Sequence, residues 1–392
     1  MSFENVYIVN ASRTPVGSFM GSLGTIPAPQ LGSIAIKNVL EKSKVDPQSI
    51  TECIMGEVLT AGVGQAPARQ AALGAGLPMS TVCTTIGKVC GSGLKAVMLA
   101  TDMIKLNPEN IIIAGGQENM TLAPHLIENS RTGFRMGPAP ITDSMIKDGL
   151  WDPYKKWHMG NAAELCVKEL KFTREEQDEF AINSYKKAQA AQTQGLFQKE
   201  IAPVKIETKK EPILIDKDEE PFNTKFDKIP GLKPAFDKDG TVTAANASKL
   251  NDGAAALLMM SESQIQKLDL KPLAKIVTHA TFAQAPEWFT TAPVGAIKKA
   301  LAQAKLNVND IDFWEINEAF SVVTMAAMKE LNIPAEKVNV HGGAVAIGHP
   351  IGASGARILT TLVHALKYYG KKRGLATLCI GGGEAVALIV EA

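Results

Sequence analysis

Cys90 has the surroundings of a reactive cysteine. It precedes the turn 91–93, Gly-Ser-Gly, and an apolar segment at 94–100 with the pattern of a helix. The N-terminal end of a helix carries positive partial charge, which favours a thiolate, and the two glycines let a substrate approach the backbone. A buried, inert cysteine before a helix explains the same residues equally well, since free cysteines are often buried. This segment alone leaves both interpretations open.

His349 lies in the glycine-rich segment 342–355. So many glycines around one histidine and one proline would pack poorly in a core, but they suit a backbone that brings an imidazole to a ligand. A lone histidine is usually structural or exposed, and here its neighbours favour function. An imidazole titrates near neutral pH, so His349 could take a proton from Cys90.

Two further candidates follow strand-like segments. Cys379 ends an apolar run and precedes three glycines at 381–383, whose backbone N–H groups could form an oxyanion hole. Asn317 follows another run and could hold a water or a polarised carbonyl. Each also has a structural explanation, a tight turn with a core cysteine and a helix cap. Together with Cys90 and His349, however, they supply the nucleophile, base and second acid/base that acyl transfer at a thioester needs.

The segments that must position these residues alternate between strands and helices. Short apolar runs predict buried strands at 6–9, 52–55, 111–114 and 376–380, and helices are predicted at 94–104 and 356–366. Such alternation predicts an α/β fold with mainly parallel sheets.

The two ends of the chain resemble each other. Segment 90–95 is echoed by 352–357, 111–116 by 377–382, and 54–57 by 316–318, in the same order and with a shift of about 260 residues. We interpret this as the duplication of a whole domain. The material between the halves is rich in Lys, Glu, Asp, Pro and Gln, and it is predicted to be an inserted region. Within it, a helix should start at Thr173, with Glu176 in the capping-box position, and 209–234 should be mostly loop.

Bulk composition narrows the class of protein. The chain has 392 residues, a net charge of +1 and 45% hydrophobic residues, which indicates two or three packed units and gives no electrostatic signature of nucleic-acid binding. Five irregularly spaced cysteines without a CxxC pair argue against zinc and indicate a reducing compartment. No targeting leader or membrane span is recognisable, so we expect a cytoplasmic protein; a mitochondrial matrix protein with its transit peptide removed would look the same.

In this order the motifs resemble those of the thiolase family, and specifically its acetoacetyl-CoA thiolases. The shared segments run nearly end to end, at 12–17, 64–70, 88–93, 114–120, 317–320, 348–350 and 379–383. The resemblance implies the α/β thiolase fold, with two duplicated βαβαβαββ halves forming a layered α/β core and an inserted loop domain. The N-terminal half would comprise 1–120 plus 248–271, the loop domain 121–247, and the C-terminal half 272–392.

The resemblance also implies an activity, the reversible Claisen condensation of two acetyl-CoA to acetoacetyl-CoA plus CoA through an acetyl-cysteine. This is the reaction of an acetyl-CoA C-acetyltransferase in lipid metabolism, in the mevalonate pathway or in ketone-body metabolism. Cys90 would carry the acetyl group, His349 would activate it, and Cys379 would move the proton of the acetyl methyl. One oxyanion site would come from His349 and a water on Asn317, and the other from the backbone N–H groups of Cys90 and Gly381.

Further positions carry over as the channel for the pantetheine arm and acyl chain: Leu150, His158, Met159, Phe236, Ala244, Ser248, Phe289, Ala319 and Phe320. Acetyl-CoA, acetoacetyl-CoA and CoA would be the partners, with no required cofactor, no nucleic acid and no membrane, and the expected assembly is a homotetramer, a dimer of dimers. Phe289 resembles the potassium-activated mitochondrial branch, which also accepts 2-methylacetoacetyl-CoA. The backbone carbonyls of Ala244, Ala245, Ala247 and Val345 resemble its potassium ligands, although Pro221 stands where its tyrosine ligand is expected.

Four residues depart from the family pattern, namely Gly87, Lys249, Phe289 and Glu384, and none of them removes a catalytic group. A broader-chain 3-ketoacyl-CoA thiolase of fatty-acid β-oxidation is the main alternative, and His158 argues against it. A non-catalytic thiolase-like CoA or lipid carrier is disfavoured because Cys90, His349 and Cys379 are all present. A nucleotide-binding oxidoreductase is disfavoured because no GxGxxG follows a strand.

Overall fold

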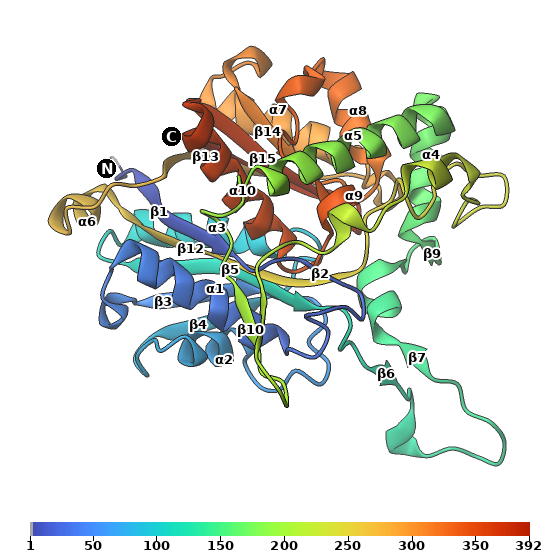
Figure 1. Cartoon of the computed structure of the whole chain (residues 1–392), viewed down its shortest axis with the longest axis horizontal. Coiled ribbons are helices and arrows are strands. Elements are labelled where there is room, and N and C mark those ends of the chain that lie inside the picture. Colours follow the sequence, from blue (N-terminus) through green and yellow to red (C-terminus); the bar gives the residue numbers. More distant parts are fainter. Residues whose placement is uncertain (1–2) are drawn as a thin grey trace.

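The computed structural model describes residues 3–392, and a ten-stranded sheet runs through them (Figure 1). Its strands follow the order β14-β15-β16-β13-β1-β12-β5-β3-β4, and β2 pairs with β12. Their bounds are β1 (Val6–Arg13), β2 (Gly17–Ser18), β3 (Glu52–Gly56), β4 (Val82–Ile86), β5 (Ile111–Asn119), β12 (Asn251–Ser261), β13 (Ala274–Ala283), β14 (Phe313–Ile316), β15 (Arg373–Ile380) and β16 (Glu384–Glu391).

The predicted duplication is visible in the strand pairing. In the N-terminal half, β3 runs parallel to β5, and β5 continues antiparallel into β12 and then β1. In the C-terminal half, β14 runs parallel to β15, which continues antiparallel into β16 and then β13. The halves join where β1 pairs antiparallel with β13. The expectation of mainly parallel sheets was wrong, because only the strands joined through helices are parallel and the others pair antiparallel.

Two helices form the layer between the halves of the sheet. They are α3 (Ser92–Leu106) and α10 (Ser354–Tyr369), and each connects two parallel strands of its own half. Both pack into one core cluster with side chains from β1, β5, β12, β15 and β16. Because α10 has sheet or helix on nearly every side, most of its residues are buried, including the polar side chains of Arg357, Thr360 and Thr361.

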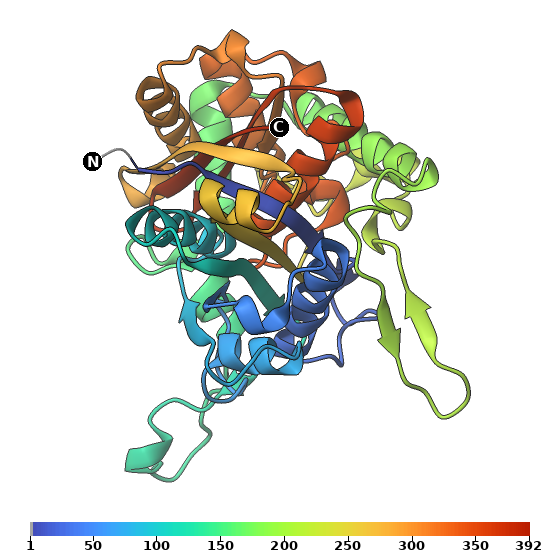
Figure 2. The ribbon, with the colours of Figure 1, turned by 90° about the vertical axis from the view of Figure 1, so that its left-hand side faces the viewer.

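Outer helices cover the remaining face of each half (Figure 2). The N-terminal half carries α1 (Ala28–Ser43) and α2 (Pro67–Gly74), and the C-terminal half carries α7 (Ala292–Ala304) and α8 (Ser321–Leu331). The short helices are α6 (Glu262–Lys267) and α9 (Ala344–Ile347). Single turns lie at Pro47–Ser49, Ser130–Thr132, Met145–Leu150, Glu220–Phe222, Phe226–Gly231, Pro286–Trp288, Val308–Asp310 and Ala335–Lys337. Among residues 3–392, no helix is both long and apolar enough to cross a membrane.

The inserted region occupies one particular connection. In the C-terminal half, β15 and β16 are joined by three glycines, whereas the equivalent strands β5 and β12 are separated by residues 120–250. This region contains the helices α4 (Met159–Leu170) and α5 (Arg174–Thr193). It also contains three short strand pairs: β6 (His125–Leu126) with β7 (Thr142–Asp143), β8 (Trp151–Asp152) with β9 (Trp157–His158), and β10 (Val204–Ile206) with β11 (Ile213–Ile215). The β6–β7 arm projects from the body in both ribbon views (Figures 1 and 2).

Local expectations for this region hold in part. The capping box at the start of α5 is confirmed, since the Thr173 hydroxyl accepts from the Glu176 N–H at 3.1 Å and the Glu176 carboxylate accepts from the Thr173 N–H at 2.7 Å. Residues 209–234 are largely loop, but they also contain β11 and two single turns. The domain boundaries proposed from the sequence remain a prediction.

Glycines allow the two central helices to meet at their N-terminal ends. A Cβ atom on Gly355 would lie 2.3 Å from the backbone nitrogen of Leu94, and one on Gly93 would lie 2.8 Å from that of Ala356. Neither neighbour can move aside easily, because both contacts are with backbone atoms. The duplicated glycines are therefore the reason that α3 and α10 begin side by side.

We predict that Gly355→Ala destabilises the protein by about 1–3 kcal/mol through this overpacking. Urea unfolding followed by circular dichroism measures the change. Gly231→Ala is the matched control, because a Cβ atom there meets nothing within 4 Å. Equal unfolding midpoints for the two variants would contradict the close approach.

Candidate active site

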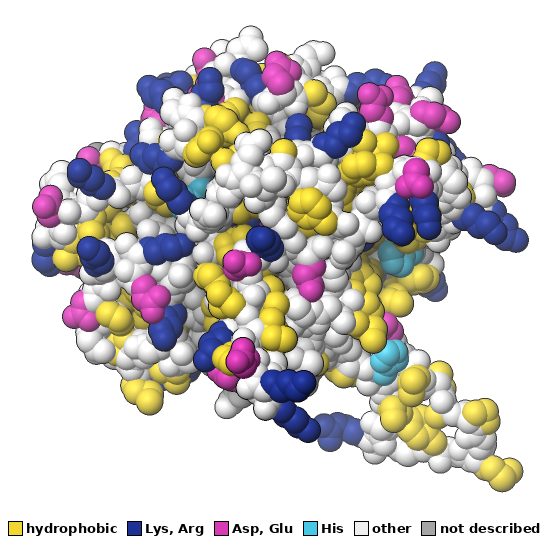
Figure 3. Space-filling view, viewed as in Figure 1, with side chains coloured by type: hydrophobic (Ala, Val, Ile, Leu, Met, Phe, Trp, Pro, Cys, Tyr) yellow, Lys and Arg dark blue, Asp and Glu magenta, His cyan; other side chains and the backbone are white. Residues whose placement is uncertain are grey.

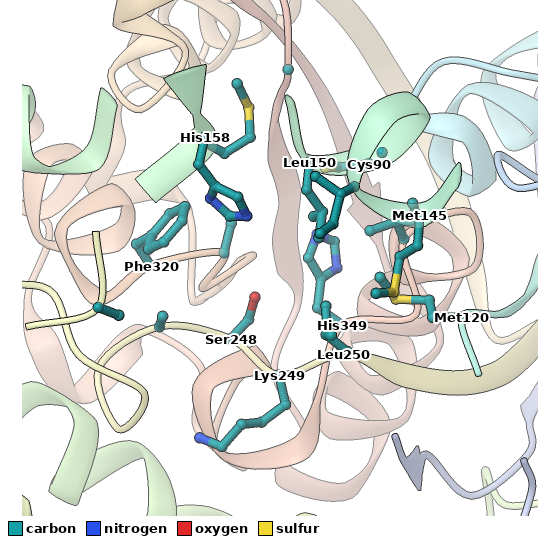
Figure 4. A pocket seen from close by; sticks show the side chains of 18 of the residues that line it. Cys90, Met120, Met145, Leu150, His158, Ser248, Lys249, Leu250, Phe320 and His349 are labelled. Atoms are coloured by element: carbon teal, nitrogen blue, oxygen red, sulfur yellow. The ribbon is translucent and has the colours of Figure 1, made fainter. Parts of the chain in front are cut away.

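A pocket of about 370 Å³ lies between the two halves and the inserted region (Figure 4). The residues predicted to line a substrate channel all line this pocket, namely Leu150, His158, Met159, Phe236, Ala244, Ser248, Phe289, Ala319 and Phe320. Cys90, His349 and Gly381 face the same space. Sequence analysis missed Met120, Met145, Ile146, Gly149, Ala235, Thr243, Leu250 and Ile351, which also line it. These are mostly small or apolar residues without a motif, so only their place in the fold identifies them.

Cys90 sits on a sharp turn directly before α3. Val89 has a left-handed backbone with φ of 45°, which is uncommon for a β-branched residue and costs energy that the surrounding structure must supply. The Ser92 hydroxyl closes the turn by accepting from the Lys88 N–H at 2.8 Å and donating to the Val89 carbonyl at 2.7 Å. The turn presents the Cys90 side chain, which is partly exposed, to the pocket.

The pKa of the Cys90 thiol is raised, whereas the position of Cys90 before a helix predicted a lowered pKa. Enclosure by the surrounding protein raises its pKa to about 11, and hydrogen bonds from the N–H groups of Gly381 and of Cys90 itself lower it by less. Burial therefore outweighs the helix end, and the resting group is a thiol. Cys90 and Gly381 border the same pocket, so their N–H groups are candidates to stabilise the charge on the oxygen of an attacked carbonyl.

His349 is buried, and its hydrogen bonds fix its tautomer. Its Nδ1 lies 2.5 Å from the Ser354 hydroxyl, which donates its own proton to the Pro350 carbonyl at 2.8 Å. Since that hydroxyl proton is already used, Nδ1 must carry the hydrogen and Nε2 is the free acceptor. The His349 N–H also donates to the side-chain oxygen of Asn251 at 2.9 Å, which anchors the loop.

The imidazole is held in its neutral form. Burial, and secondarily the positive charge of Arg357, lower the pKa of His349 to about 3. A neutral ring with an unprotonated Nε2 can accept a proton from a thiol. The resting pair of Cys90 and His349 is therefore neutral on both sides rather than an ion pair.

Asn317 and Cys379 lie fully buried behind the pocket wall. The Asn317 side-chain nitrogen is 3.5 Å from His349 Nε2, and its side-chain oxygen is buried without a protein hydrogen-bond partner. Cys379 ends β15, and burial followed by the nearby Cys90 raises its pKa well above the ordinary thiol value. The structure thus gathers all five predicted catalytic positions at one site: Cys90, Asn317, His349, Cys379 and Gly381.

An aromatic wall bounds the pocket on the side of the inserted region. The ring of His158 stacks on Phe236 with centroids 4.7 Å apart, and Phe320 lies edge-on to Phe236 at 6.0 Å and to Phe289 at 6.3 Å. His158 Nδ1 accepts from the Gly160 N–H at 3.1 Å and so begins α4. Because Nδ1 is an acceptor and burial lowers the pKa of His158, the neutral ring carries its hydrogen on Nε2 as a donor.

The departures from the family pattern have structural explanations. Glu384 forms an ion pair with Lys88, so its charge is compensated beside the Cys90 turn. Gly87 leaves open space, since a Cβ atom there would meet nothing nearer than 3.8 Å. Lys249 contacts the hydroxyl of Tyr185 and the carbonyl of Ala244.

Comparison with known proteins gives consistent matches along the whole chain. The family model described as thiolase, N-terminal domain, matches residues 6–263, and that described as thiolase, C-terminal domain, matches 270–392. The acetyl-CoA acetyltransferase of Cupriavidus necator is 54% identical over 99% of both chains. The cytosolic acetyl-CoA acetyltransferase of Gibberella zeae is 50% identical over 98% of both, and the mitochondrial one of Bos taurus is 48% identical over 100% of this chain and 92% of its own.

Solved structures superpose equally well. The crystal structure of Acat5 thiolase from Ascaris suum in complex with coenzyme A gives a TM-score of 0.94 at 43% identity, covering 99% of this chain and 100% of that one. The Bacillus anthracis acetyl-CoA acetyltransferase gives 0.97 at 40% identity, covering 100% of this chain and 99% of that one.

We predict that Cys90 carries no thiolate at neutral pH and that its thiolate signal appears only as the pH approaches about 11, because burial raises its pKa. The measurement is the ultraviolet thiolate absorbance of the wild type minus that of Cys90→Ser across a pH series, over the range in which circular dichroism shows both to be folded. A full thiolate difference already present at neutral pH would mean an ion pair with His349 and would refute the neutral pair.

Proposed function

The chain belongs to the thiolase family, and on that premise we propose how its residues carry out the reversible condensation of two acetyl-CoA to acetoacetyl-CoA and CoA. Its relatives along nearly the full length are acetyl-CoA acetyltransferases, and the chain is an acyltransferase of this kind. The observation that carries the residue assignment is that Cys90, His349 and Gly381, which come from distant parts of the chain, line one pocket.

In the first half-reaction, Cys90 becomes acetylated. As the Cys90 sulfur bonds to the carbonyl carbon of acetyl-CoA, its proton passes to Nε2 of His349, whose tautomer leaves that nitrogen free. The C–S bond to CoA then breaks, and the leaving thiolate takes a proton from Cys379. The enzyme is left with acetyl-Cys90, a protonated His349 and a thiolate at Cys379.

In the second half-reaction, the carbon–carbon bond forms. The Cys379 thiolate removes a proton from the methyl group of a second acetyl-CoA, and the raised pKa of this cysteine makes its thiolate a strong base. The resulting carbanion attacks the carbonyl of acetyl-Cys90, and the Cys90 sulfur leaves and recovers its proton from His349. Both cysteines are thiols again and His349 is neutral, so the cycle balances, and it runs backwards as thiolysis.

Two oxyanion sites stabilise the charged oxygens. Backbone N–H groups of Cys90 and Gly381 serve the tetrahedral intermediate on Cys90. The protonated Nε2 of His349, with a water held by the unpartnered side-chain oxygen of Asn317, serves the enolate of the second acetyl-CoA. Preorganised donors of this kind each contribute about 3–4 kcal/mol to transition-state stabilisation.

The cargo of the pocket is a short acyl chain. The rings of His158, Phe236, Phe289 and Phe320 pack against one another along one wall, and we propose that this wall limits the length of the acyl chain. The Nε2–H of His158 supplies a polar donor on that wall, which suits the oxygen of a short 3-ketoacyl or pantetheine group. Ser248 and Leu150 bound the pocket on other sides (Figure 4).

The assembly that we propose is a homotetramer, a dimer of dimers. The arm around β6 and β7 exposes large apolar side chains, among them Phe134, Met136 and Ile141 (Figure 3). The sheet ends at β4, where Val82 is 59% exposed. An apolar arm and an open strand edge are surfaces that a soluble enzyme ordinarily covers with further subunits.

The site of action that we propose is the cytoplasm, with the mitochondrial matrix as the alternative, since relatives are named for both compartments. A potassium ion on the carbonyls of Ala244, Ala245, Ala247 and Val345 is the remaining candidate suggested by the family resemblance. The Ala244 carbonyl already accepts from the ammonium of Lys249 at 2.8 Å, so a metal ion would have to share or displace this contact.

Separate variants distinguish the two cysteines. We expect Cys90→Ser to abolish the acetyl-enzyme that forms on incubation with radiolabelled acetyl-CoA. Cys379→Ser should still acetylate but lose condensation by about 10²–10⁴-fold, the usual contribution of a general acid/base. Cys83→Ser, outside the pocket, should behave as the wild type. Identical behaviour of the Cys90 and Cys379 variants would refute the division of roles.

Chain-length preference tests the cargo. The kcat/KM for thiolysis of acetoacetyl-CoA should exceed that of a long-chain 3-ketoacyl-CoA by about tenfold or more, because the aromatic wall excludes the longer chain. Thiolysis of 2-methylacetoacetyl-CoA in the same assay determines whether Phe289 permits a branched substrate. A preference for the long chain would favour the β-oxidation alternative instead.

A further inference from the structure

Lys249 makes a set of contacts that the catalytic cycle does not use. Its ammonium donates to the hydroxyl of Tyr185 at 2.6 Å and to the carbonyl of Ala244 at 2.8 Å, and it lies 5.4 Å from the centre of the Tyr185 ring. Tyr185 is fully buried on α5. In Figure 4 the Lys249 side chain points away from Cys90 and His349, although its residue borders the pocket.

The contacts tie down one particular loop, residues 243–248, which we name the channel loop. Ala244, Ala247 and Ser248 of this loop line the pocket. On one side the loop is fixed to the C-terminal half, where the Ser248 N–H donates to the Ala319 carbonyl at 2.9 Å and the Ser321 N–H donates to the Asn246 carbonyl at 2.8 Å.

On its other side the channel loop faces α5. There the Asn246 side chain donates to Asp178 at 2.9 Å, and Lys249 bridges the loop carbonyl at Ala244 to Tyr185. Lys249 therefore anchors the outer part of the channel loop to α5, at the point where Ala244 is exposed.

We propose that Lys249 is a positioning residue whose ammonium acts as a built-in monovalent cation, holding the channel loop in the shape that receives the pantetheine arm without a dissolved metal ion. A carbonyl oxygen, a hydroxyl oxygen and an aromatic ring are together a suitable environment for a singly charged cation. A cation attached to the chain does not have to be recruited from solution. The cation position beside the loop therefore stays occupied at low salt. This inference rests on the proposed assignment of the pocket to acyl-pantetheine.

The first experiment measures steady-state thiolysis by Lys249→Met, Lys249→Ala and Tyr185→Phe. We expect Lys249→Met to raise KM for acetoacetyl-CoA about tenfold or more, as the loss of a charged hydrogen bond does, with a smaller change in kcat. Tyr185→Phe should shift KM in the same direction, because it removes one of the two acceptors. Lys209→Met is the control, since this exposed lysine lies outside the pocket and should leave KM unchanged.

Cation rescue separates the proposal from a merely structural role. Wild-type activity should be the same in sodium, potassium and ammonium chloride at equal ionic strength, whereas potassium or ammonium should restore Lys249→Ala more than sodium does. A wild type that requires potassium, or a Lys249→Ala variant that responds equally to all three salts, would overturn the proposal.

A truncated substrate excludes the other role of a lysine beside this pocket, which is contact with the phosphates of CoA. Acetoacetyl-pantetheine lacks those phosphates, so a loop-positioning role predicts the same relative loss in Lys249→Met for this substrate as for acetoacetyl-CoA. A loss confined to acetoacetyl-CoA would overturn the proposal in favour of phosphate binding.

A final measurement does not depend on the reaction. Hydrogen–deuterium exchange of residues 243–248 should be faster in Lys249→Met than in the wild type or Lys209→Met, at unchanged melting temperature. Unchanged exchange would overturn the proposal even if the enzyme is active. Faster exchange in an enzyme without wild-type thiolysis would instead support the role of Lys249 and refute the proposed function.

Discussion

The close contact between the N-terminal ends of α3 and α10 is the constraint on which the rest of the structure depends. Gly93 and Gly355 leave no room for a side chain between the two helices, and this brings the turn of Cys90 beside the loop that carries His349. The two groups come from residues far apart in the chain, yet the duplicated halves place them at equivalent helix ends. Cys90 and His349, the proposed nucleophile and base, are thus positioned by the central layer of the fold rather than by flexible loops.

Burial then decides the protonation states at this contact. It raises the pKa of Cys90 and of Cys379 and lowers that of His349, so the resting site holds neutral groups. The neutrality of Cys90, Cys379 and His349 coexists with a buried guanidinium nearby, since the side-chain nitrogens of Arg357 have no hydrogen-bond partner among residues 3–392. This neutrality also makes the charges that appear during acyl transfer depend on fixed donors, the N–H groups of Cys90 and Gly381.

The two halves use the same connection for different purposes. In the C-terminal half, three glycines after β15 bring the Gly381 N–H to the cysteine, and in the N-terminal half the equivalent connection has grown into the region that walls the pocket. The proposed catalytic residues therefore come from the duplicated core, and the insertion supplies much of the pocket wall. The hydrogen bonds of Lys249 to Tyr185 and to the Ala244 carbonyl connect the last part of the insertion, directly before β12, to α5.

The sequence by itself determined the duplication and predicted the residues that meet at one pocket, because glycine-rich turns at Cys90, His349 and Cys379 leave local signals in a single chain. It failed for features that depend on the environment of a residue. The direction of the Cys90 pKa followed from enclosure by distant segments, which outweighed the local helix end. The last strands in each half pair antiparallel, and Lys249 donates a hydrogen bond to Tyr185. In both cases the residues in contact share no sequence motif. Only the tertiary structure decided these features, because packing brings distant groups into contact and determines how far each group is removed from water.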